Sequence, residues 1–561
     1  MNENVDEAAQ KAARIEEVEA AIARAESDEA WSAIDKLYNE LWRTKEPTAV
    51  QLGRQAIAVF HLKDVPRAAT MTRRAVRLAP ENAHLRRQLG KLYFELGRFD
   101  VAEKEFRTAM DLEPDHPETL RRLSQIIQKD KESRAEAEEL LIRATELAPD
   151  EVIGWLQLGA LYGNEKYNFK KAEAAFEHAL EISPNAPSAL HNYGLLKRFQ
   201  GDLEAAEKYL ERACEVYPND SDFAFSLGTC HMFKEDNETA LTWFRRAVEL
   251  NPHNNAAQVY IAFSLFLLGR MREGWAQYDK RLDLAEFKTT NYERPRWDGT
   301  DLEGKTLLML SEQGMGDNIQ FVRYAPIAAK MNGEVIVLTH ESLARLFKSL
   351  DGVNHVVTSV PEPRHFHRYC PLMSAPLALG TDENTIPGVV PYLTPPAEDV
   401  EKWAEKLAPY TGKKIGLCWR GNPKHVHDHF RSSSLEEMQG LLDIEGATFF
   451  SLHKDRTEDE QELPDGLIDI GSEFGDFADT AAAMLNLDLV ISVDTSVCHV
   501  AGAIGAPVWT MIARGPDFRW GLEAETSPWY PTMKLLRQKT LGDWSDVYAR
   551  MRADISKLAV E

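Results

Sequence analysis

A glycine-rich turn that ends in an acidic residue has the residue types that catalysis requires. The turn runs Glu312-Gln-Gly-Met-Gly-Asp317, between an apolar run and a predicted helix. Gly314 and Gly316 permit a tight turn and a close approach of a ligand to backbone N–H groups. Asp317 could accept a proton from a hydroxyl nucleophile. Alternatively, because Gln320 follows three residues later, Asp317 matches a capping-box pattern, and the helix terminus would lower its pKa and make it a weaker base.

A second motif, Ser492-Val-Asp-Thr-Ser-Val-Cys-His499, has the features of a phosphate site. A predicted strand ends at Asp494, and a helix then opens with Thr495 and Ser496, so that unpaired N–H donors and a positive dipole end face a phosphate. His499 follows Ser496 by three residues and therefore shares its helix face. A protonated or hydrogen-bond-donating imidazole there could neutralise a departing diphosphate. The alternative is a structural histidine.

A third cluster is basic. Arg420, Lys424 and Arg431 are the positive groups that this chain would need around an anionic donor. Three histidines alternate in the same loop: His425, His427 and His429. They could indicate a metal, but because no second ligand cluster accompanies them, a solvated loop is the preferred interpretation and no metal is predicted.

Short apolar runs must position these three motifs. Six of them predict buried strands, at 305–310, 334–338, 414–419, 447–452, 487–492 and 507–511. Helical patterns alternate with the runs, which is typical of an α/β region with parallel sheets. A proline-rich stretch predicts a division into two Rossmann-like halves, 301–395 and 396–561, the second including a terminal helix. A nucleotide-bearing ligand is expected in the crevice at the carboxyl ends of the strands.

Prolines recur at a regular spacing before this region. They stand 34, 35, 35, 34 and 34 residues apart, at Pro80, Pro114, Pro149, Pro184, Pro218 and Pro252. This period predicts tetratricopeptide repeats, about seven and some degenerate, over 49–285. Helices at 1–48 precede them and a linker at 286–300 follows. Such repeats form an all-α solenoid whose concave groove usually binds a peptide or protein segment; the alternative is a spacer or oligomerisation arm.

Charge and composition exclude several classes of protein. The 561-residue chain has 65 Lys and Arg against 89 Asp and Glu, a formal net charge of −24, which disfavours nucleic acid as a partner. No stretch approaches the roughly 18 consecutive apolar residues of a membrane span. The first residues lack the features of a secretory signal, and the five cysteines are scattered. A cytoplasmic protein without structural zinc or disulfides is therefore expected.

Five motifs together carry a family resemblance. They lie at 313–324, 476–480, 493–502, 516–520 and 528–531. The set resembles, over about residues 290–545, the heptosyltransferase-type GT-B glycosyltransferase domain that bacteria fuse to tetratricopeptide repeats. The resemblance implies a metal-independent glycosyltransferase that uses a nucleotide sugar as co-substrate and needs no cofactor. It also implies that Asp317 is the base that activates the acceptor, and that the turn from Asp494 to His499 binds the donor diphosphate.

The order of the parts implies a protein acceptor. Repeats followed by a GT-B module resemble protein O-glycosyltransferases, and among them bacterial flagellin glycosyltransferases that attach nonulosonic acids, such as pseudaminic or legionaminic acid, from a CMP donor. The first half, at about 95 residues, is shorter than in a free-standing heptosyltransferase, which puts a lipopolysaccharide-type acceptor site in doubt and leaves room for the repeats to present the acceptor.

The sequence thus predicts transfer of a sugar to Ser or Thr of a protein recruited by the repeats. The predicted catalytic residues are Asp317 and His499. The predicted donor-binding residues are Gly314, Gly316, Arg420, Lys424, Arg431, Asp494, Thr495 and Ser496. Two alternatives remain: a repeat scaffold whose glycosyltransferase module is degenerate and only binds, and a transferase that acts on a glycan or lipid.

Overall fold

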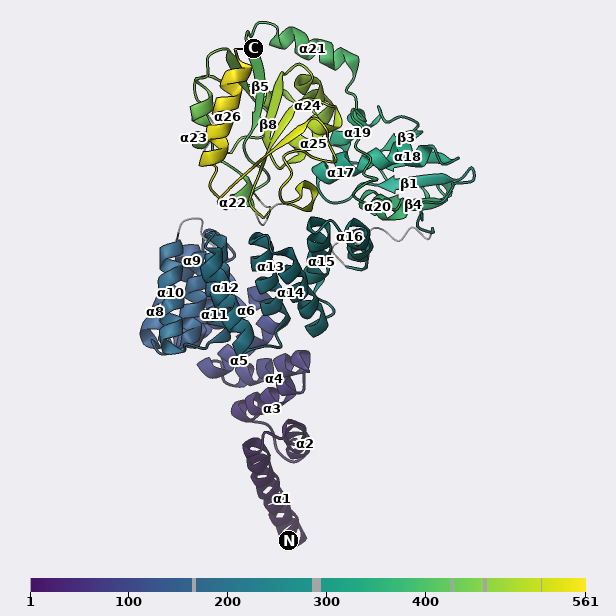
Figure 1. Ribbon diagram of the computed structural model, residues 1–561. Helices are drawn as coiled ribbons and strands as arrows, with labels where there is room; N and C mark the ends of the chain where they lie inside the picture. The colour runs from purple at the N-terminus through teal and green to yellow at the C-terminus, as the bar shows by residue number, and fades with distance from the viewer. Residues whose placement is uncertain are drawn as a thin grey trace. The chain divides into compact units, whose positions relative to one another are not determined.

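The chain divides into two compact units, residues 1–196 and 197–561. The structure, a computed structural model, describes residues 2–163, 168–284, 294–423, 425, 428–457, 462–515 and 517–560 (Figure 1). None of the helices in these described ranges has the length and hydropathy needed to cross a bilayer.

The first unit is built from helices. In chain order they are α1 (Asn2–Ser27), α2 (Trp31–Leu41), α3 (Ala49–His61), α4 (Val65–Leu78), α5 (Ala83–Glu95), α6 (Phe99–Leu112), α7 (Pro117–Ile127), α8 (Arg134–Leu147), α9 (Val152–Gly163) and α10 (Phe169–Ile182). From α3 onward, consecutive helices pack in pairs. Small residues make this packing possible: a Cβ built on Gly159 of α9 would stand 2.6 Å from the Phe176 ring of α10, and one on Gly90 of α5 would stand 3.0 Å from Phe106 of α6.

The second unit begins with the last repeats. Helix α11 (Pro187–Phe199) crosses the boundary between the units, and the helices that follow are α12 (Leu203–Val216), α13 (Ser221–Phe233), α14 (Asn237–Leu250), α15 (Asn255–Leu267), α16 (Met271–Tyr278) and the 3-10 helix η1 (Asp279–Asp283). A glycine again allows close helix packing, because a Cβ on Gly228 of α13 would lie 2.7 Å from Phe244 of α14. The predicted tetratricopeptide solenoid is confirmed.

A first parallel sheet follows the repeats. Its strands are β1 (Thr306–Leu310), β2 (Glu334–Leu338), β3 (His355–Val357) and β4 (Arg368–Pro371), in the order β3-β2-β1-β4. Its helices are α17 (Met315–Phe321), α18 (Ala325–Ala329), α19 (Glu341–Phe347) and α20 (Ala375–Ala378). Every residue of β1 is buried, as expected for a central strand covered on both faces.

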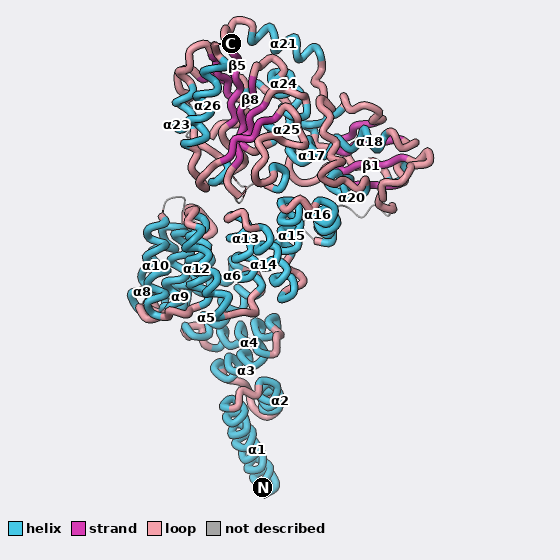
Figure 2. The backbone as a smooth tube through the Cα atoms, in the orientation of Figure 1, coloured by secondary structure: helices cyan, strands magenta, loops and turns pink. Residues whose placement is uncertain are grey.

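A second parallel sheet completes the α/β region. Its strands are β5 (Lys413–Cys418), β6 (Ala447–Ser451), β7 (Leu467–Asp469), β8 (Leu489–Val493), β9 (Val508–Ile512) and β10 (Met533–Arg537), in the order β10-β9-β8-β5-β6-β7. Its helices are α21 (Ala397–Leu407), α22 (Asp428–Arg431), α23 (Leu435–Met438), α24 (Phe477–Met484), α25 (Ser496–Ala503) and α26 (Ser545–Leu558). The predicted fold class, a helical solenoid followed by two parallel α/β halves, is confirmed (Figure 2).

The end of the predicted linker packs against the first sheet. Only residues 294–300 of the predicted 286–300 segment are described. Trp297 is 4% exposed, and its backbone N–H donates to the carbonyl of Tyr369 in β4 at 2.8 Å. This stretch is therefore ordered by contacts with the sheet that it precedes.

Aromatic side chains join the last repeats to the α/β region within the second unit. Phe518, in the 3-10 helix η9 (Phe518–Trp520), stacks on Phe263 of α15 with ring centroids 5.3 Å apart. Trp275 of α16 meets Phe321 of α17 edge to face at 5.8 Å. These contacts place α15 and α16 beside the elements that form the cleft described next.

Candidate functional site

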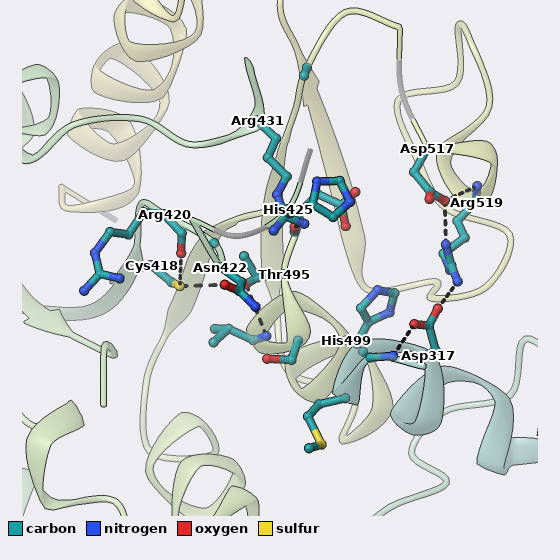
Figure 3. A pocket seen from close by; sticks show the side chains of 18 of the residues that line it. Asp317, Cys418, Arg420, Asn422, His425, Arg431, Thr495, His499, Asp517 and Arg519 are labelled. Atoms are coloured by element: carbon teal, nitrogen blue, oxygen red, sulfur yellow. Dashed lines mark hydrogen bonds and ion pairs between the residues drawn. The ribbon is translucent and has the colours of Figure 1, made fainter. Parts of the chain in front are cut away.

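A cleft of about 1220 Å3 lies at the carboxyl ends of the strands. Its lining comes from the turn between β1 and α17, the loop after β5, the turn between β8 and α25, the segment after β9, and the repeat helices α13, α15 and α16. The described residues of the predicted catalytic and donor-binding sets all line it. Figure 3 labels five of them: Asp317, Arg420, Arg431, Thr495 and His499. Lys424 is outside the described residues.

Asp317 stands in the first turn of α17. Gly314 is the N-cap of this helix, and the Oδ2 atom of Asp317 accepts a hydrogen bond from its backbone N–H at 2.9 Å. Oδ1 of Asp317 forms an ion pair with Arg519. Burial raises the pKa of the Asp317 carboxyl, the nearby Asp517 adds to the increase, and Arg519 opposes it. The expected lowering by the helix terminus is therefore outweighed, and the direction of the shift makes Asp317 a stronger base than an ordinary aspartate.

The capping alternative for Asp317 is correct in part. Asp317 does satisfy a free N–H of the helix terminus, but from the third position of the helix and not as the N-cap. Gln320 makes no reciprocal cap; its Oε1 accepts a hydrogen bond from Nε of Arg519 at 2.6 Å. The turn is thus stabilised by the same carboxylate that faces the cleft.

Arg519 is the site residue that sequence reasoning missed. Its side chain is 9% exposed, and besides Asp317 it pairs with Asp517 at 2.7 Å. It therefore connects the second sheet's side of the cleft, through η9, to helix α17 of the first half (Figure 3). The run Asp517-Phe-Arg519 could have indicated Arg519 as a site residue, because an acidic and a basic side chain flank an aromatic one shortly after a predicted strand.

His499 is buried behind Asp317. Its Nδ1 atom lies 2.9 Å from the Tyr530 hydroxyl in a hydrogen bond, and its ring stacks on Trp520. A Cβ on Gly316 would stand 2.8 Å from Cδ2 of His499, so the glycine is needed for α17 to approach α25. Burial, with Arg519 adding, lowers the pKa of His499 well below its usual value. This shift favours the neutral imidazole, which is the hydrogen-bond-donating form of the two that the sequence leaves open.

The N-terminus of α25 faces the cleft. Thr495 is its N-cap, and the Thr495 Oγ1 atom accepts a hydrogen bond from the N–H of Val497 at 3.3 Å. One of the donors expected to be unpaired is therefore already satisfied. Nη1 of Arg431 donates to the Asp494 carbonyl at 3.0 Å, which brings a cation to this terminus. Burial raises the pKa of the Asp494 carboxyl to about 6, and Asp517 contributes in the same direction.

The two described cations of the basic loop are held by other groups of the protein. Arg431 donates from Nε to Asp428 at 3.0 Å, and Nη2 of Arg420 donates to the carbonyl of Asp455 at 2.6 Å. Both side chains line the cleft. Contacts within the protein therefore hold both cations at the lining of the cleft.

The alternating histidines do not gather around one point in the described structure. His425 lines the cleft, whereas the His429 ring stacks on Phe199 with centroids 3.8 Å apart. His427 is outside the described residues.

Two other groups bring potential ligand atoms within 4.8 Å of one another: Asp494, Cys498 and His499, and Glu207, Glu211 and His231. Burial raises the pKa of the Cys498 thiol well above its usual value, so the thiolate that a metal prefers is scarce. In the second group, Nζ of Lys234 already pairs with Glu207 at 2.6 Å. Neither set favours a metal ion.

Comparison with known proteins identifies the repeats. Models of the tetratricopeptide repeat match residues 60–126, 150–219 and 194–255. The N-terminal part therefore contains tetratricopeptide repeats. Over 94% of its length, this chain is similar to Protein FlbA of Caulobacter vibrioides (strain ATCC 19089 / CIP 103742 / CB 15), with 24% identity and 88% of FlbA covered.

Solved repeat proteins are also similar to this chain. A tetratricopeptide repeat protein from Parabacteroides merdae ATCC 43184 is 14% identical and matches 45% of this chain and 99% of its own, with a TM-score of 0.40. A thermophilic repeat protein of Thermus thermophilus is 21% identical and matches 33% of this chain and 99% of its own, with a TM-score of 0.30.

Proposed function

We propose that this chain is a protein O-glycosyltransferase, which moves a sugar from a nucleotide-sugar donor to a Ser or Thr hydroxyl of a protein held by the repeats. The observation that carries the proposal is the composition of one cleft: the Asp317 carboxyl with its raised pKa, the helix terminus at Thr495, and side chains of the repeats. The resemblance to flagellin glycosyltransferases makes flagellin the first acceptor to test, and a CMP-activated nonulosonic acid the first donor.

Asp317 supplies the base in this proposal. The acceptor hydroxyl oxygen bonds to the anomeric carbon, its proton passes to the Asp317 carboxylate, and the bond between that carbon and the phosphate oxygen breaks. Arg519 and the N–H of Gly314 fix the orientation of the carboxylate. A fixed orientation matters because a base must lie within hydrogen-bond reach of the proton that it takes.

The cleft also offers positive groups to the departing nucleotide. The N-terminus of α25 presents its dipole and the hydroxyls of Thr495 and Ser496, while Arg420 and Arg431 bring full charges. Neutral His499 contributes orientation and hydrogen bonding, not charge. Preorganised donors of this kind stabilise charge that develops on a leaving group without reorganising during the reaction.

The test is intact-mass measurement of flagellin co-expressed with the full chain and a CMP-nonulosonic acid pathway. Flagellin should gain the mass of the sugar, once for each modified hydroxyl. An Asp317→Asn chain, expressed at the same level, is the matched control and should leave flagellin unmodified. Localisation of the sugar by fragmentation should place it on Ser or Thr.

The two alternatives give different results in the same system. A chain that binds no nucleotide and hydrolyses no nucleotide sugar would support the scaffold and overturn the proposal. Sugar recovered on a glycan or lipid, with all protein acceptors unmodified, would overturn the protein acceptor while retaining the transferase.

A further inference from the structure

Gln313 adopts a backbone conformation that residues other than glycine rarely adopt. It precedes Gly314 in the glycine-rich turn that leads to Asp317, and its φ is 58°. The two glycines of the turn do not take this conformation: Gly314 has a φ of −78°, and Gly316 belongs to α17. Left-handed backbone is unfavourable for a residue with a side chain, and such outliers gather at functional sites. The side chain of Gln313 is therefore expected to contribute something that a glycine could not supply.

That contribution is a hydrogen bond to the last repeat. Nε2 of Gln313 donates to the Tyr278 hydroxyl at 2.7 Å, and both residues line the cleft. Tyr278 ends α16 and is buried, so the packing of the repeat fixes its position. The turn is thus attached, through a side chain that glycine lacks, to a buried group of another element.

A second contact joins the same two elements. Arg281 pairs with Glu312, the residue before Gln313, at 2.6 Å. The Arg281 guanidinium also lies over the Tyr278 ring, 4.6 Å from its centroid. Two neighbouring residues of the turn are therefore held by two residues at the end of the last repeat.

Hydrogen bonds within the turn connect these contacts to the base. Asn318 donates from Nδ2 to the Gly314 carbonyl at 2.9 Å, and its Oδ1 accepts from the N–H of Glu312 at 2.9 Å. Asp317 accepts from the N–H of Gly314 at 2.9 Å. Because Gln313 lies between Glu312 and Gly314, a change in its backbone would shift these groups and the Asp317 carboxylate with them.

We propose that Gln313 and Tyr278 are positioning residues, through which the last repeat holds the glycine-rich turn so that Asp317 points at the acceptor hydroxyl. The left-handed conformation at Gln313 sets the direction of the turn, and the hydrogen bond to Tyr278 retains it. Neither residue takes a proton or contacts the bond that breaks. This inference rests on the proposed transfer with Asp317 as its base, and it gives the repeats a part in catalysis besides acceptor binding.

Substitutions at the two positions test the positioning by separating kcat from KM. Gln313→Gly permits the same φ but removes the hydrogen bond, and Tyr278→Phe removes only the hydroxyl. In assays with flagellin and a CMP-nonulosonic acid, each should lower kcat roughly tenfold to a hundredfold, because misplacing a catalytic group by about 1 Å has an effect of that order. KM for the donor and KM for the acceptor should not change. A rise in the acceptor KM with kcat unchanged would make Gln313 a binding residue and overturn the proposal.

The double variant tests whether the two residues act as one unit. If Tyr278 acts through Gln313, Tyr278→Phe should have no further effect in a Gln313→Gly chain, whereas independent losses multiply. A double variant whose kcat falls by the product of the two single losses would therefore contradict the proposal.

Matched controls exist for both substitutions. Glu303 also has a positive φ, of 51°, and the buried Tyr324 hydroxyl shares a hydrogen bond with Thr381 at 3.0 Å. Neither Glu303 nor Tyr324 lines the cleft as the structure describes it. Glu303→Gly and Tyr324→Phe should therefore have the wild-type kcat.

Hydrogen exchange of the turn separates failure of the positioning from failure of the proposed function, because it requires no transfer. Mass spectrometry of peptides that contain residues 312–318 should show faster amide exchange in Tyr278→Phe than in wild type, and no change in Tyr324→Phe. Faster exchange in Tyr278→Phe, when the wild-type chain transfers no sugar, would support the hold of the repeat on the turn and refute the transferase. Unchanged exchange would refute the positioning whether or not the wild type transfers sugar.

Discussion

Replacing Asp317 by asparagine tests the proposed base most directly, because the structure predicts that the variant folds. The asparagine oxygen can still accept the hydrogen bond from the N–H of Gly314, which the carboxylate accepts at 2.9 Å. Arg519 loses one partner but keeps Asp517 at 2.7 Å and Gln320 at 2.6 Å. The loss is one charged hydrogen bond, about 1.5–3 kcal/mol, and relief of a buried carboxylate offsets part of it.

The effect on transfer should be much larger than the effect on stability. A positioned general base contributes about 100-fold to 10,000-fold, so kcat of Asp317→Asn should fall by that factor while CMP binding is retained. The wild-type rate should also rise with pH as Asp317 deprotonates. Because burial raises its pKa, the rise should be centred above the ordinary pKa of aspartate, and it should be missing in the variant.

A matched substitution at Asp517 separates two roles of Asp317: catalysis as a base, and the ion pair that holds Arg519 in place. Asp517→Asn removes another carboxylate from the same arginine, but leaves the turn between β1 and α17 intact. It should retain most of the transfer activity, and because Asp517 raises the pKa of Asp317, it should move the pH-dependent rise to lower pH. Equal losses in the two variants, or a wild-type rate in Asp317→Asn, would refute the assignment of Asp317 as base.

Three further substitutions test the surroundings of the base. His499→Gln should weaken CMP binding, measured by calorimetry, by the same factor at every pH from about 6 to 8. The factor should be constant because the pKa of His499 lies well below its usual value. A factor that shrinks as the pH rises would indicate a protonated imidazole. Gly316→Ala should lower the free energy of unfolding by about 1–3 kcal/mol, because its Cβ would stand 2.8 Å from His499, whereas Gly440→Ala, where nothing lies within 4 Å, should not. Asp494→Asn should gain stability relative to wild type as pH rises. A folded pKa of about 6 against the ordinary 3.8 means that the wild-type contribution is present at low pH, falls between about pH 4 and 6, and is absent above that range. The change in denaturant unfolding between pH 4 and 8 should be about 2.5 kcal/mol. A constant difference between the two chains would contradict the raised pKa.

The strands that the sequence could and could not predict differ in their position in the sheets. All six predicted runs correspond to strands, among them β1 and β8, whose residues are all buried. The four missed strands, β3, β4, β7 and β10, stand at the edges of the two sheets. An edge strand is covered less completely, so it does not need the continuous apolar run on which the prediction depended. The repeats were predictable because their period and packing are local.

The residues at the strand ends were predictable, but their protonation states were not. Asp317 and His499 follow strands within one short motif each, so local sequence was enough to select them. Their pKa shifts depend on burial and on Arg519, which is 202 residues from Asp317 in the chain. For both residues, local sequence indicates only the charge preferred at a helix terminus or by a phosphate, whereas the tertiary environment shifts each pKa toward the neutral form.

The last repeat is part of the architecture of the cleft and not a detachable arm. Arg281, just after α16, pairs with Glu312 at 2.6 Å, and their side chains are 0% and 8% exposed. Glu312 opens the glycine-rich turn that leads to Asp317, and it also accepts a hydrogen bond from the N–H of Met373 at 2.9 Å. Leaving one partner of a buried ion pair alone typically destabilises a protein by about 3–5 kcal/mol. A truncation that removed Arg281 would therefore disturb the turn that holds the base, and loss of activity in such a truncation would say nothing about acceptor binding. Point substitutions of the cleft-lining residues in α13, α15 and α16 are needed to separate recognition from catalysis in this chain.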